Sequence, residues 1–326
     1  MKILVIRLSS IGDIVLTSPV VRCLKQQLAG AELHFLCKEP MLPVVEKNPY
    51  LSRIHLFRPE EKTLVNELRA EQFDCVIDLQ KSRLSRRLVH SLGKDYHSFP
   101  KLNFRKMLLV LFKLDLLPRK HVVDRYFEAV RFLSVKNDGK GLDFFLSDED
   151  YKALEQLNLP PHYVAVAVGS QHATKQIPVD KIQEIMRMTA HPMVFLGDSR
   201  DALLVKKLCQ RHPEAVNLCG KLPLSLSAAC LSRAETVLTG DTGLMHIACA
   251  FHKRVVSLWG NTVPAFGMYP YQPGHEENVH IVENRNLWCR PCSKLGYNRC
   301  PLGHFRCMRR LSASDTAALL NEDMMF

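Results

Sequence analysis

Apolar runs of four or five residues recur along the first half of the chain, separated by longer stretches whose apolar positions have helical spacing. The runs predict strands and the longer stretches predict helices. Strands that are apolar at nearly every position are typical of a parallel sheet covered on both faces. The predicted strands are residues 3–6, 33–36, 54–57 and 75–79, and the predicted helices are residues 13–28, 60–71 and 122–133.

The same alternation begins again in the second half, after a polar junction at residues 137–150. Because 326 residues are more than one compact core usually holds, the repetition predicts two domains in tandem. Each is expected to be an α/β domain with a doubly wound parallel sheet. Here the predicted strands are residues 163–168, 193–196, 236–238 and 255–259, and the predicted helices are residues 179–188, 202–210, 244–250 and 312–320.

Apolar residues make up 47% of the chain and charged residues 24%, a balance that is typical of a globular protein and excludes a disordered one. No run reaches the roughly 18 apolar residues that a membrane-spanning helix needs. The first residues lack the cleavage site of a signal peptide. Since eleven cysteines without such a leader favour a reducing compartment, we expect a cytoplasmic protein.

Ligands of open α/β sheets bind where strands end and helices begin, so polar residues at these turns indicate candidate sites. The first turn reads Ser9-Ser10-Ile11-Gly12-Asp13. A carboxylate there can take a proton from a hydroxyl nucleophile, although Asp13 could also simply cap the following helix. The turn has neither the G-x-G-x-x-G dinucleotide fingerprint nor a P-loop, which argues against a simple dehydrogenase or NTPase.

A second turn runs from Thr239 to His246 and is rich in small residues. Its backbone N–H groups at a helix N-terminus can bind phosphate or diphosphate without a metal. Asp241 suits the hydroxyls of a neighbouring sugar better than the phosphate itself. The alternative is a helix capped by Asp241 or Thr242, with His246 packed in the core.

The third turn, at residues 170–178, contains Lys175 between a predicted strand and a predicted helix. A lysine there could neutralise charge on a leaving diphosphate. The alternative is an ordinary solvated loop lysine.

Together the three turns resemble the lipopolysaccharide heptosyltransferases of glycosyltransferase family 9. The resemblance rests on S-S-I-G-D at 9–13, T-K-Q-I-P at 174–178, G-D-T-G-L-M-H at 240–246 and C-P-L-G-H-F-R-C-M at 300–308. Two features depart from the family pattern. Ile177 stands where the family often has an aromatic residue, and both Asp198 and Asp201 are candidates for one ribose-binding position.

The resemblance implies a GT-B fold, in which two Rossmann-like domains face a central cleft. We therefore expect an acceptor-binding domain at residues 1–150, a nucleotide-sugar-binding domain at 151–311 and a terminal helix at 312–326 that crosses back to the first domain. The implied reaction is an inverting transfer of heptose from ADP-heptose to the inner core of lipopolysaccharide, without a metal or another required cofactor.

Carried over by position, the resemblance makes Asp13 the general base. It places Ser9, Ser10 and Gly12 in the cleft beside that carboxylate. Lys175 and the backbone amides of Thr242 and Gly243 are expected to bind the donor diphosphate. Asp241 is expected to bind the donor sugar. The full set of expected donor-binding residues is Thr174, Lys175, Asp241, Thr242, Gly243 and His246.

The net charge of +11 indicates an anionic partner. Residues 101–120 mix basic with large apolar residues, which predicts either contact with the anionic inner membrane or a cradle for an acidic acceptor. The alternative is a solvated helix with a buried apolar stripe. No nucleic-acid-binding signature is present, so no nucleic-acid partner is expected. Further contacts to acceptor phosphates are expected from Lys81, Arg83, Arg86 and Arg87.

Four cysteines lie within nineteen residues, in the spacing C-x2-C-x7-C-x6-C. A leading C-x-x-C pair with two further cysteines could hold a structural zinc, with His304 as a substitute ligand. The wide second spacing favours the alternative of free thiols in a tight loop. The cysteines are Cys289, Cys292, Cys300 and Cys307.

The sequence is also compatible with two other functions. One is a GT-B transferase that uses another nucleotide sugar, and the other is a non-catalytic module that binds anions or membranes. Because a binding module needs no base beside a diphosphate cradle, the pairing of Asp13 with residues 240–243 favours the enzyme.

Overall fold

A computed structural model describes residues 1–59 and 63–322, and the chain divides into two compact units. Unit 1 comprises residues 1–101 and 120–145, and unit 2 comprises residues 102–119 together with the chain from residue 146 onward. The expected first domain, residues 1–150, included 102–119. These residues group with unit 2 because Lys113 Nζ donates to the carbonyl of Pro291 at 2.7 Å and the Lys106 ammonium lies 5.6 Å from the centre of the Phe266 ring.

Unit 1 is built on a five-stranded parallel sheet in the order β3-β2-β1-β4-β5. The four strands predicted from apolar runs are confirmed. The fifth strand was not predicted because its three residues are polar or half-exposed. The strands are β1 (Lys2–Ile6), β2 (Glu32–Lys38), β3 (Arg53–Phe57), β4 (Cys75–Asp78) and β5 (Tyr96–Ser98).

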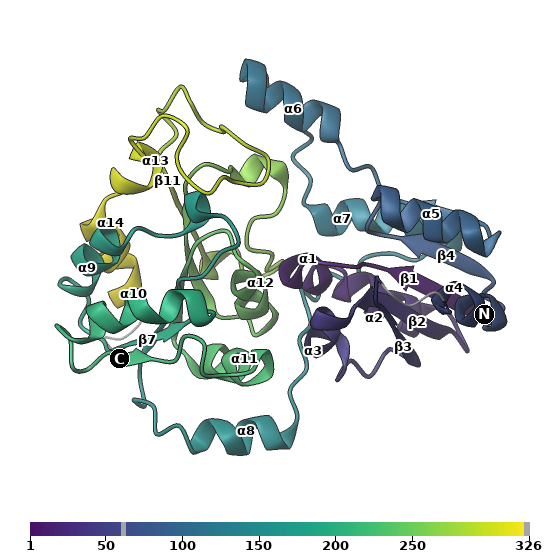
Figure 1. Ribbon diagram of the computed structural model, residues 1–326, viewed down its shortest axis with the longest axis horizontal. Helices are drawn as coiled ribbons and strands as arrows, with labels where there is room; N and C mark the ends of the chain where they lie inside the picture. The colour runs from purple at the N-terminus through teal and green to yellow at the C-terminus, as the bar shows by residue number, and fades with distance from the viewer. Residues whose placement is uncertain (60–62, 323–326) are drawn as a thin grey trace. The chain divides into compact units, whose positions relative to one another are not determined.

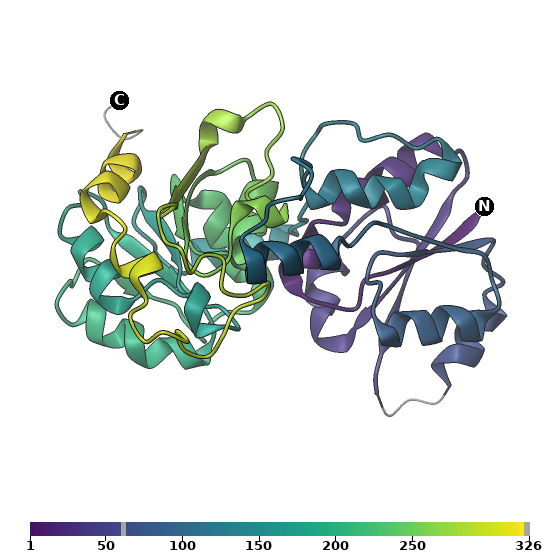
Figure 2. The ribbon, with the colours of Figure 1, turned by 90° about the horizontal axis from the view of Figure 1, so that it is seen from above.

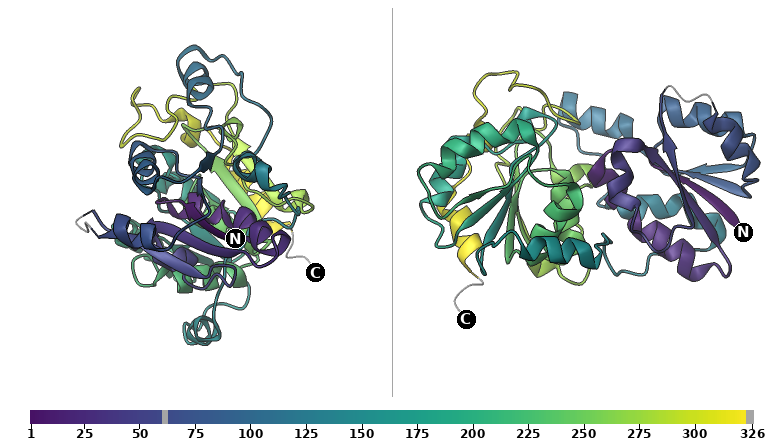
Figure 3. Two further views of the ribbon diagram at one scale, coloured as in Figure 1. Left: turned by 90° about the vertical axis from the view of Figure 1, so that its right-hand side faces the viewer. Right: turned by 60° about the horizontal axis from the view of Figure 1, so that its bottom comes forward.

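Helices cover both faces of this sheet, as the right-hand view of Figure 3 shows. On one face Leu4, Ile6 and Val76 pack in a core with leucines of two helices from the second half of the unit. The helices of unit 1 are α1 (Ile11–Val15), α2 (Ser18–Gln27), α3 (Leu42–Val45), α4 (Leu64–Ala70), α5 (Arg83–Leu92) and α7 (Val122–Tyr126), with 3-10 turns at Glu39–Met41 and Phe127–Leu133.

Two predicted helices of unit 1 differ from the structure. The stretch 13–28 is two helices, because Pro19 has no N–H to continue the hydrogen-bond ladder and instead occupies the first turn of α2. The stretch 122–133 is α-helical only to Tyr126 and then becomes a 3-10 helix. The first residues of the predicted helix 60–71 lie outside the described residues.

Unit 2 contains a six-stranded parallel sheet in the order β11-β10-β9-β6-β7-β8. Its four predicted strands are confirmed, while the two strands at the sheet's edges were missed because they are half-buried and partly polar. The strands are β6 (Val164–Ala167), β7 (Met193–Leu196), β8 (Val216–Asn217), β9 (Thr236–Thr239), β10 (Arg254–Trp259) and β11 (Val279–Glu283).

Helices also cover both faces of the sheet of unit 2, whereas α6 lies apart from that sheet (Figure 1). The helices of the unit are α6 (Asn103–Phe112), α8 (Asp148–Glu155), α9 (Val179–Met186), α10 (Ser199–Cys209), α11 (Leu224–Arg233), α12 (Gly243–Ala250), α13 (Arg306–Arg309) and α14 (Ala313–Asn321), with 3-10 turns at Ala173–Lys175, Pro264–Phe266 and Glu276–Asn278. Among the described residues, no helix has the length and apolar character needed to cross a membrane.

The terminal helix α14 packs against α9 and β10 inside unit 2. Leu320 is 1% exposed and belongs to the same core as Phe195 and Ile182. From the sequence, residues 312–326 are expected to cross back to the first domain, whereas the contacts of the described helix α14 are with its own unit. Burial of the apolar face of α14 stabilises this position against the sheet of unit 2.

Each sheet has one switch point, where the strand order reverses and adjacent loops run in opposite directions. In unit 1 it lies between β1 and β4, which pair Ile6 with Asp78 at their ends. In unit 2 it lies between β6 and β9, which pair Ala167 with Thr239. The three turns singled out in the sequence follow β1, β6 and β9, so they lie at these two switch points.

Candidate active site

Asp13 lies in the first turn of α1, directly after the end of β1. Its Oδ2 accepts hydrogen bonds from the backbone N–H of Ser10 at 3.2 Å and from the Ser10 hydroxyl at 2.9 Å. Ser10 is the N-cap of α1, and Asp13 completes its capping box from the third helical position, so Asp13 does take part in capping the helix. Both carboxylate oxygens have partners, Oδ1 in Arg7 and Oδ2 in Ser10, yet the Asp13 side chain is still 22% exposed.

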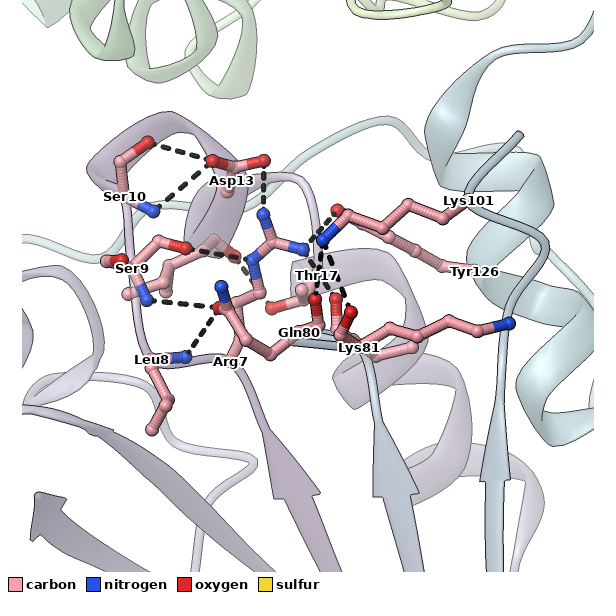
Figure 4. Close-up of polar contacts among 12 residues, drawn as sticks. Arg7, Leu8, Ser9, Ser10, Asp13, Thr17, Gln80, Lys81, Lys101 and Tyr126 are labelled. Atoms are coloured by element: carbon pink, nitrogen blue, oxygen red, sulfur yellow. Dashed lines mark hydrogen bonds and ion pairs between the residues drawn. The ribbon is translucent and has the colours of Figure 1, made fainter. Parts of the chain in front are cut away.

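The buried guanidinium of Arg7 forms an ion pair with Asp13 (Figure 4). Arg7 also donates to the carbonyl of Ser9 at 3.1 Å and to the Tyr126 hydroxyl at 3.1 Å, which fixes its plane. Burial disfavours the charged carboxylate, but Arg7 and the Ser10 hydrogen bonds outweigh it and hold the pKa of Asp13 below its ordinary value. Asp13 is therefore ionised at neutral pH.

Residues after β4 support this turn from the side (Figure 4). Gln80 Oε1 accepts from the backbone N–H groups of Leu8 and Ser9 at 3.0 and 3.3 Å. Lys101 Nζ donates to the carbonyl of Gln80 at 3.0 Å, and burial together with Arg7 lowers the pKa of Lys101. The contacts of Arg7, Gln80 and Lys101 join segments far apart in the chain, so the sequence alone did not place these residues at this turn.

The four basic residues proposed for the acceptor divide into two groups. Arg83, Arg86 and Arg87 lie on α5 and are exposed. Lys81 precedes the helix, and its Nζ donates to the carbonyl of Phe99 at 2.8 Å. The buried carboxylate of Asp78 orients this loop by accepting from the N–H groups of Gln80 and Lys81 at 2.9 and 2.8 Å.

In unit 2, Lys175 and Asp241 meet at the switch point. Lys175 Nζ lies 2.7 Å from Asp241 Oδ2, and the Thr262 hydroxyl donates to that same oxygen at 2.9 Å. The side chains of Lys175 and Asp241 are 18% and 13% exposed, so both can reach a ligand. The structure thus joins two residues that the sequence placed in separate turns, and Lys175 is not an ordinary solvated lysine.

Thr242 is the N-cap of α12, and its hydroxyl accepts from the backbone N–H of Met245 at 3.3 Å. The N-terminus of α12 therefore starts beside the Lys175–Asp241 pair. His246 is 2% exposed within this helix. A side chain on Gly240 would come within 2.5 Å of the carbonyl oxygen of Lys175, so only glycine permits this approach of the two loops.

Thr174 ties the Lys175 loop to a distant segment. Its hydroxyl accepts from the backbone N–H of Tyr297 at 2.8 Å, and its own N–H donates to the carbonyl of Tyr297 at 3.1 Å. Thr174 is 2% exposed. Its buried side chain holds the loop rather than facing solvent.

Both acids considered for a ribose lie at the start of α10. Asp198 is the N-cap and accepts from the backbone N–H of Arg200 at 2.8 Å. Asp201 accepts from the N–H of Asp198 at 3.0 Å, and burial raises the pKa of Asp201. Asp201 is 8% exposed and packs under Gly169 and Gly197, whereas the Asp198 side chain is 46% exposed. Of the two, Asp198 is the more accessible.

The sequence profile of glycosyltransferase family 9 (heptosyltransferase) matches residues 62–300. The chain belongs to this glycosyltransferase family. It is 23% identical over 289 residues to lipopolysaccharide heptosyltransferase 1 of Campylobacter coli, covering 80% of this chain and 84% of that protein.

Two solved structures share the fold of this family member. The crystal structure of a family 9 glycosyltransferase from Veillonella parvula superposes with a TM-score of 0.78 and 21% identity, covering 98% of this chain and 97% of that one. The E. coli ADP-heptose lipopolysaccharide heptosyltransferase II has a TM-score of 0.73 and 18% identity, covering 99% and 98%. The two parallel-sheet α/β units are those of the GT-B fold, as the sequence predicted.

Proposed function

We propose that this glycosyltransferase transfers heptose from ADP-heptose to the inner core of lipopolysaccharide, with inversion and without a metal. The observation behind this proposal is that Lys175, Asp241 and the N-terminus of α12 lie together at one switch point. This group offers a cation and free backbone N–H groups to a diphosphate, and a carboxylate to a sugar. The names of the relatives in Campylobacter coli and E. coli support the same donor and acceptor class.

In the proposed reaction, an acceptor hydroxyl oxygen attacks the anomeric carbon as the bond to the leaving ADP breaks. The electron pair of that bond leaves with the diphosphate, where Lys175 and the amides of Thr242 and Gly243 stabilise the new charge. Asp241 accepts hydrogen bonds from the sugar hydroxyls. No step of this scheme requires a metal, because Lys175 and the helix N-terminus supply the positive charge.

Asp13 takes the proton of the acceptor hydroxyl in this scheme. Its lowered pKa makes it a weak base. A weak base suffices if the proton moves late, because the hydroxyl becomes much more acidic as its oxygen bonds to an oxocarbenium-like carbon. Ser10 and Arg7 then position the carboxylate, and Ser9 and Gly12 form the surrounding turn.

Helix α6 is proposed to bring the enzyme to its lipid-linked acceptor. Phe104 and Phe112 are 66% and 71% exposed, whereas Leu109 is the buried residue of α6, at 7%. Figure 2 shows α6 beside the loop of residues 283–305, where Trp288 is 77% exposed. Exposed aromatic residues among lysines and arginines are suited to the interface of an anionic membrane.

The direct test is incubation of the purified chain with ADP-heptose and inner-core acceptors, followed by mass spectrometry and by NMR of the new anomeric linkage. We expect a mass increase of one heptose, with inversion, in the presence of EDTA. Asp13→Asn should reduce turnover by about 10²–10⁴-fold while leaving ADP affinity nearly unchanged. Retained turnover in this variant contradicts the role of Asp13.

A thermal-shift comparison tests the donor separately. ADP at about a hundred times its Kd should stabilise the chain by about 2.7 kcal/mol, whereas UDP and NAD should not. Selective stabilisation by UDP would instead support a transferase for another nucleotide sugar. The absence of any nucleotide effect would support the non-catalytic alternative.

A further inference from the structure

The four clustered cysteines of unit 2 line a single cavity of about 30 Å³, together with His304. They come from two chain segments, the C-x-x-C pair at residues 289–292 and the segment that contains Cys300 and Cys307. A cavity of this size holds one small atom or ion. The sequence pattern alone left open whether these thiols lie at one place, and all four line the same cavity, although no three of their sulfur atoms lie within 4.8 Å of one another.

Asn261 supplies a second, independent observation at the same place. It is 1% exposed and lines the cavity, yet neither its amide oxygen nor its amide nitrogen has a hydrogen-bond partner among the described residues. A buried polar group without a partner costs roughly 1–3 kcal/mol. An occupant of the cavity with negatively charged ligand atoms would give the Asn261 N–H₂ group an acceptor.

The surrounding contacts hold the cysteine segments in place. The buried guanidinium of Arg290, between the first two cysteines, donates to the carbonyls of Gly260 and Thr262 at 2.6 and 3.0 Å. The backbone N–H of Phe305 donates to Cys300 Sγ at 3.4 Å.

We propose that Cys289, Cys292, Cys300 and Cys307 bind one thiophilic metal ion, zinc or iron, as four thiolates in tetrahedral geometry. This donor set is the one that selects zinc or iron among the divalent metals. Metal–sulfur bonds of about 2.3 Å require the sulfurs to move inward from the cavity wall. His304 Nε2, 4.0 Å from Cys289 Sγ, is then close enough to donate a hydrogen bond to a bound thiolate.

A rival group lies in unit 1, and it is less suited to a metal. His34, His55 and Glu71 place three candidate ligand atoms within 4.8 Å of one another, as no other group of described residues does. However, His34 Nδ1 and His55 Nε2 already share a hydrogen bond at 2.9 Å. Glu71 is paired with the ammonium of Lys2 at 3.0 Å and with Arg53, so its charge is already neutralised.

The metal would act on the structure of the donor loop rather than on the reaction. The segment between the two cysteine pairs contains Tyr297, whose backbone is bonded in both directions to Thr174, next to Lys175. Tyr297 Oη also donates to the carbonyl of Cys292 at 3.1 Å. An ion that closes the cysteine loop therefore stabilises the position of Thr174.

The test is elemental analysis of the full chain, purified without chelators, by inductively coupled plasma mass spectrometry. We expect about one zinc or iron per chain, and the analysis itself tells the two metals apart. The variant Cys289→Ser/Cys292→Ser should lose at least about nine-tenths of that metal, since two of four ligands are removed. Cys209→Ser, at a half-buried thiol on α10, should retain it.

A measurement on the unmodified chain covers the case in which the double variant does not fold. After metal removal with a chelator, addition of Co²⁺ should produce the intense visible bands of a tetrahedral cobalt thiolate, and zinc should displace them. Metal content below about a tenth of an equivalent, with no cobalt bands, would overturn the proposal. Full metal retention in the double variant would overturn it equally.

Discussion

Lys175 and Asp241 neutralise each other across the switch point of unit 2, with Nζ 2.7 Å from Oδ2. A diphosphate at the N-terminus of α12 would compete with Asp241 for the ammonium of Lys175. Asp241 would keep the hydroxyl hydrogen bond of Thr262 and gain sugar hydroxyls as donors. The ion pair is therefore expected to exchange partners when the proposed donor binds.

Lys175→Ala tests this exchange. Removal of the cation should raise the Kd for ADP at least about tenfold, or ~1.4 kcal/mol, as measured by calorimetry. Lys207→Ala, at an exposed lysine of α10, is the matched control and should bind ADP as the unmodified chain does. Equal affinities for the two variants would mean that Lys175 does not touch the diphosphate.

Arg7→Met should shift the pH dependence of turnover. Burial raises the pKa of Asp13 while Arg7 and Ser10 lower it, so loss of the guanidinium should move this pKa above its ordinary value of about 3.9. The acid limb of the kcat/KM profile should then move to higher pH. Arg53→Met, at an exposed arginine of unit 1, serves as the control. If the acid limb of the profile is not shifted in Arg7→Met, Asp13 is not the group that accepts the proton.

Asp138→Asn should destabilise the protein in a pH-dependent way. The hydrogen bonds of Arg22 lower the pKa of Asp138 to about 2, below the ordinary value of about 3.9. Stabilisation by this pair is therefore complete above pH ~4 and is lost as pH falls toward ~2. The Tm difference from the unmodified protein should be full at neutral pH and shrink across that window. The exposed Asp95→Asn control should show little difference at any pH.

Membrane contact through α6 is testable by flotation with vesicles that contain phosphatidylglycerol. Phe104→Asp/Phe112→Asp should reduce the floated fraction by roughly tenfold, because both exposed rings are replaced by charges that anionic lipid repels. Leu203→Asp is a matched control, since Leu203 on α10 is 68% exposed. If both variants lose the same part of the floated fraction, α6 has no specific role in membrane contact.

The buried strands could be predicted from the sequence because parallel strands covered on both faces are continuous apolar runs. The predicted strand 193–196 matches β7 in full. Helices α5 and α11 were missed, since arginines and serines interrupt their apolar positions. The break before α2 was missed because Pro19 was read inside one long helix rather than as the first turn of a second.

The sequence could predict those residues of the candidate site that follow a buried strand. Asp13, Lys175 and Asp241 each follow a buried strand, and the switch-point rule then brings them to the correct edge of a sheet. Their partners were not predictable. Tyr126 reaches Arg7 across 119 positions of sequence, and Thr262 reaches Asp241 across 21, so only the folded backbone shows these contacts.

The chain passes between the two units more than once, because residues 102–119 group with unit 2 although unit 1 resumes at residue 120. During synthesis this segment leaves the ribosome well before Cys289 and Pro291, whose carbonyls Lys113 contacts. The sheet of unit 1 can thus form before the segment of unit 2 that Lys113 contacts has been synthesised. A protease that cuts once near residue 146 would leave α6 attached to the wrong fragment.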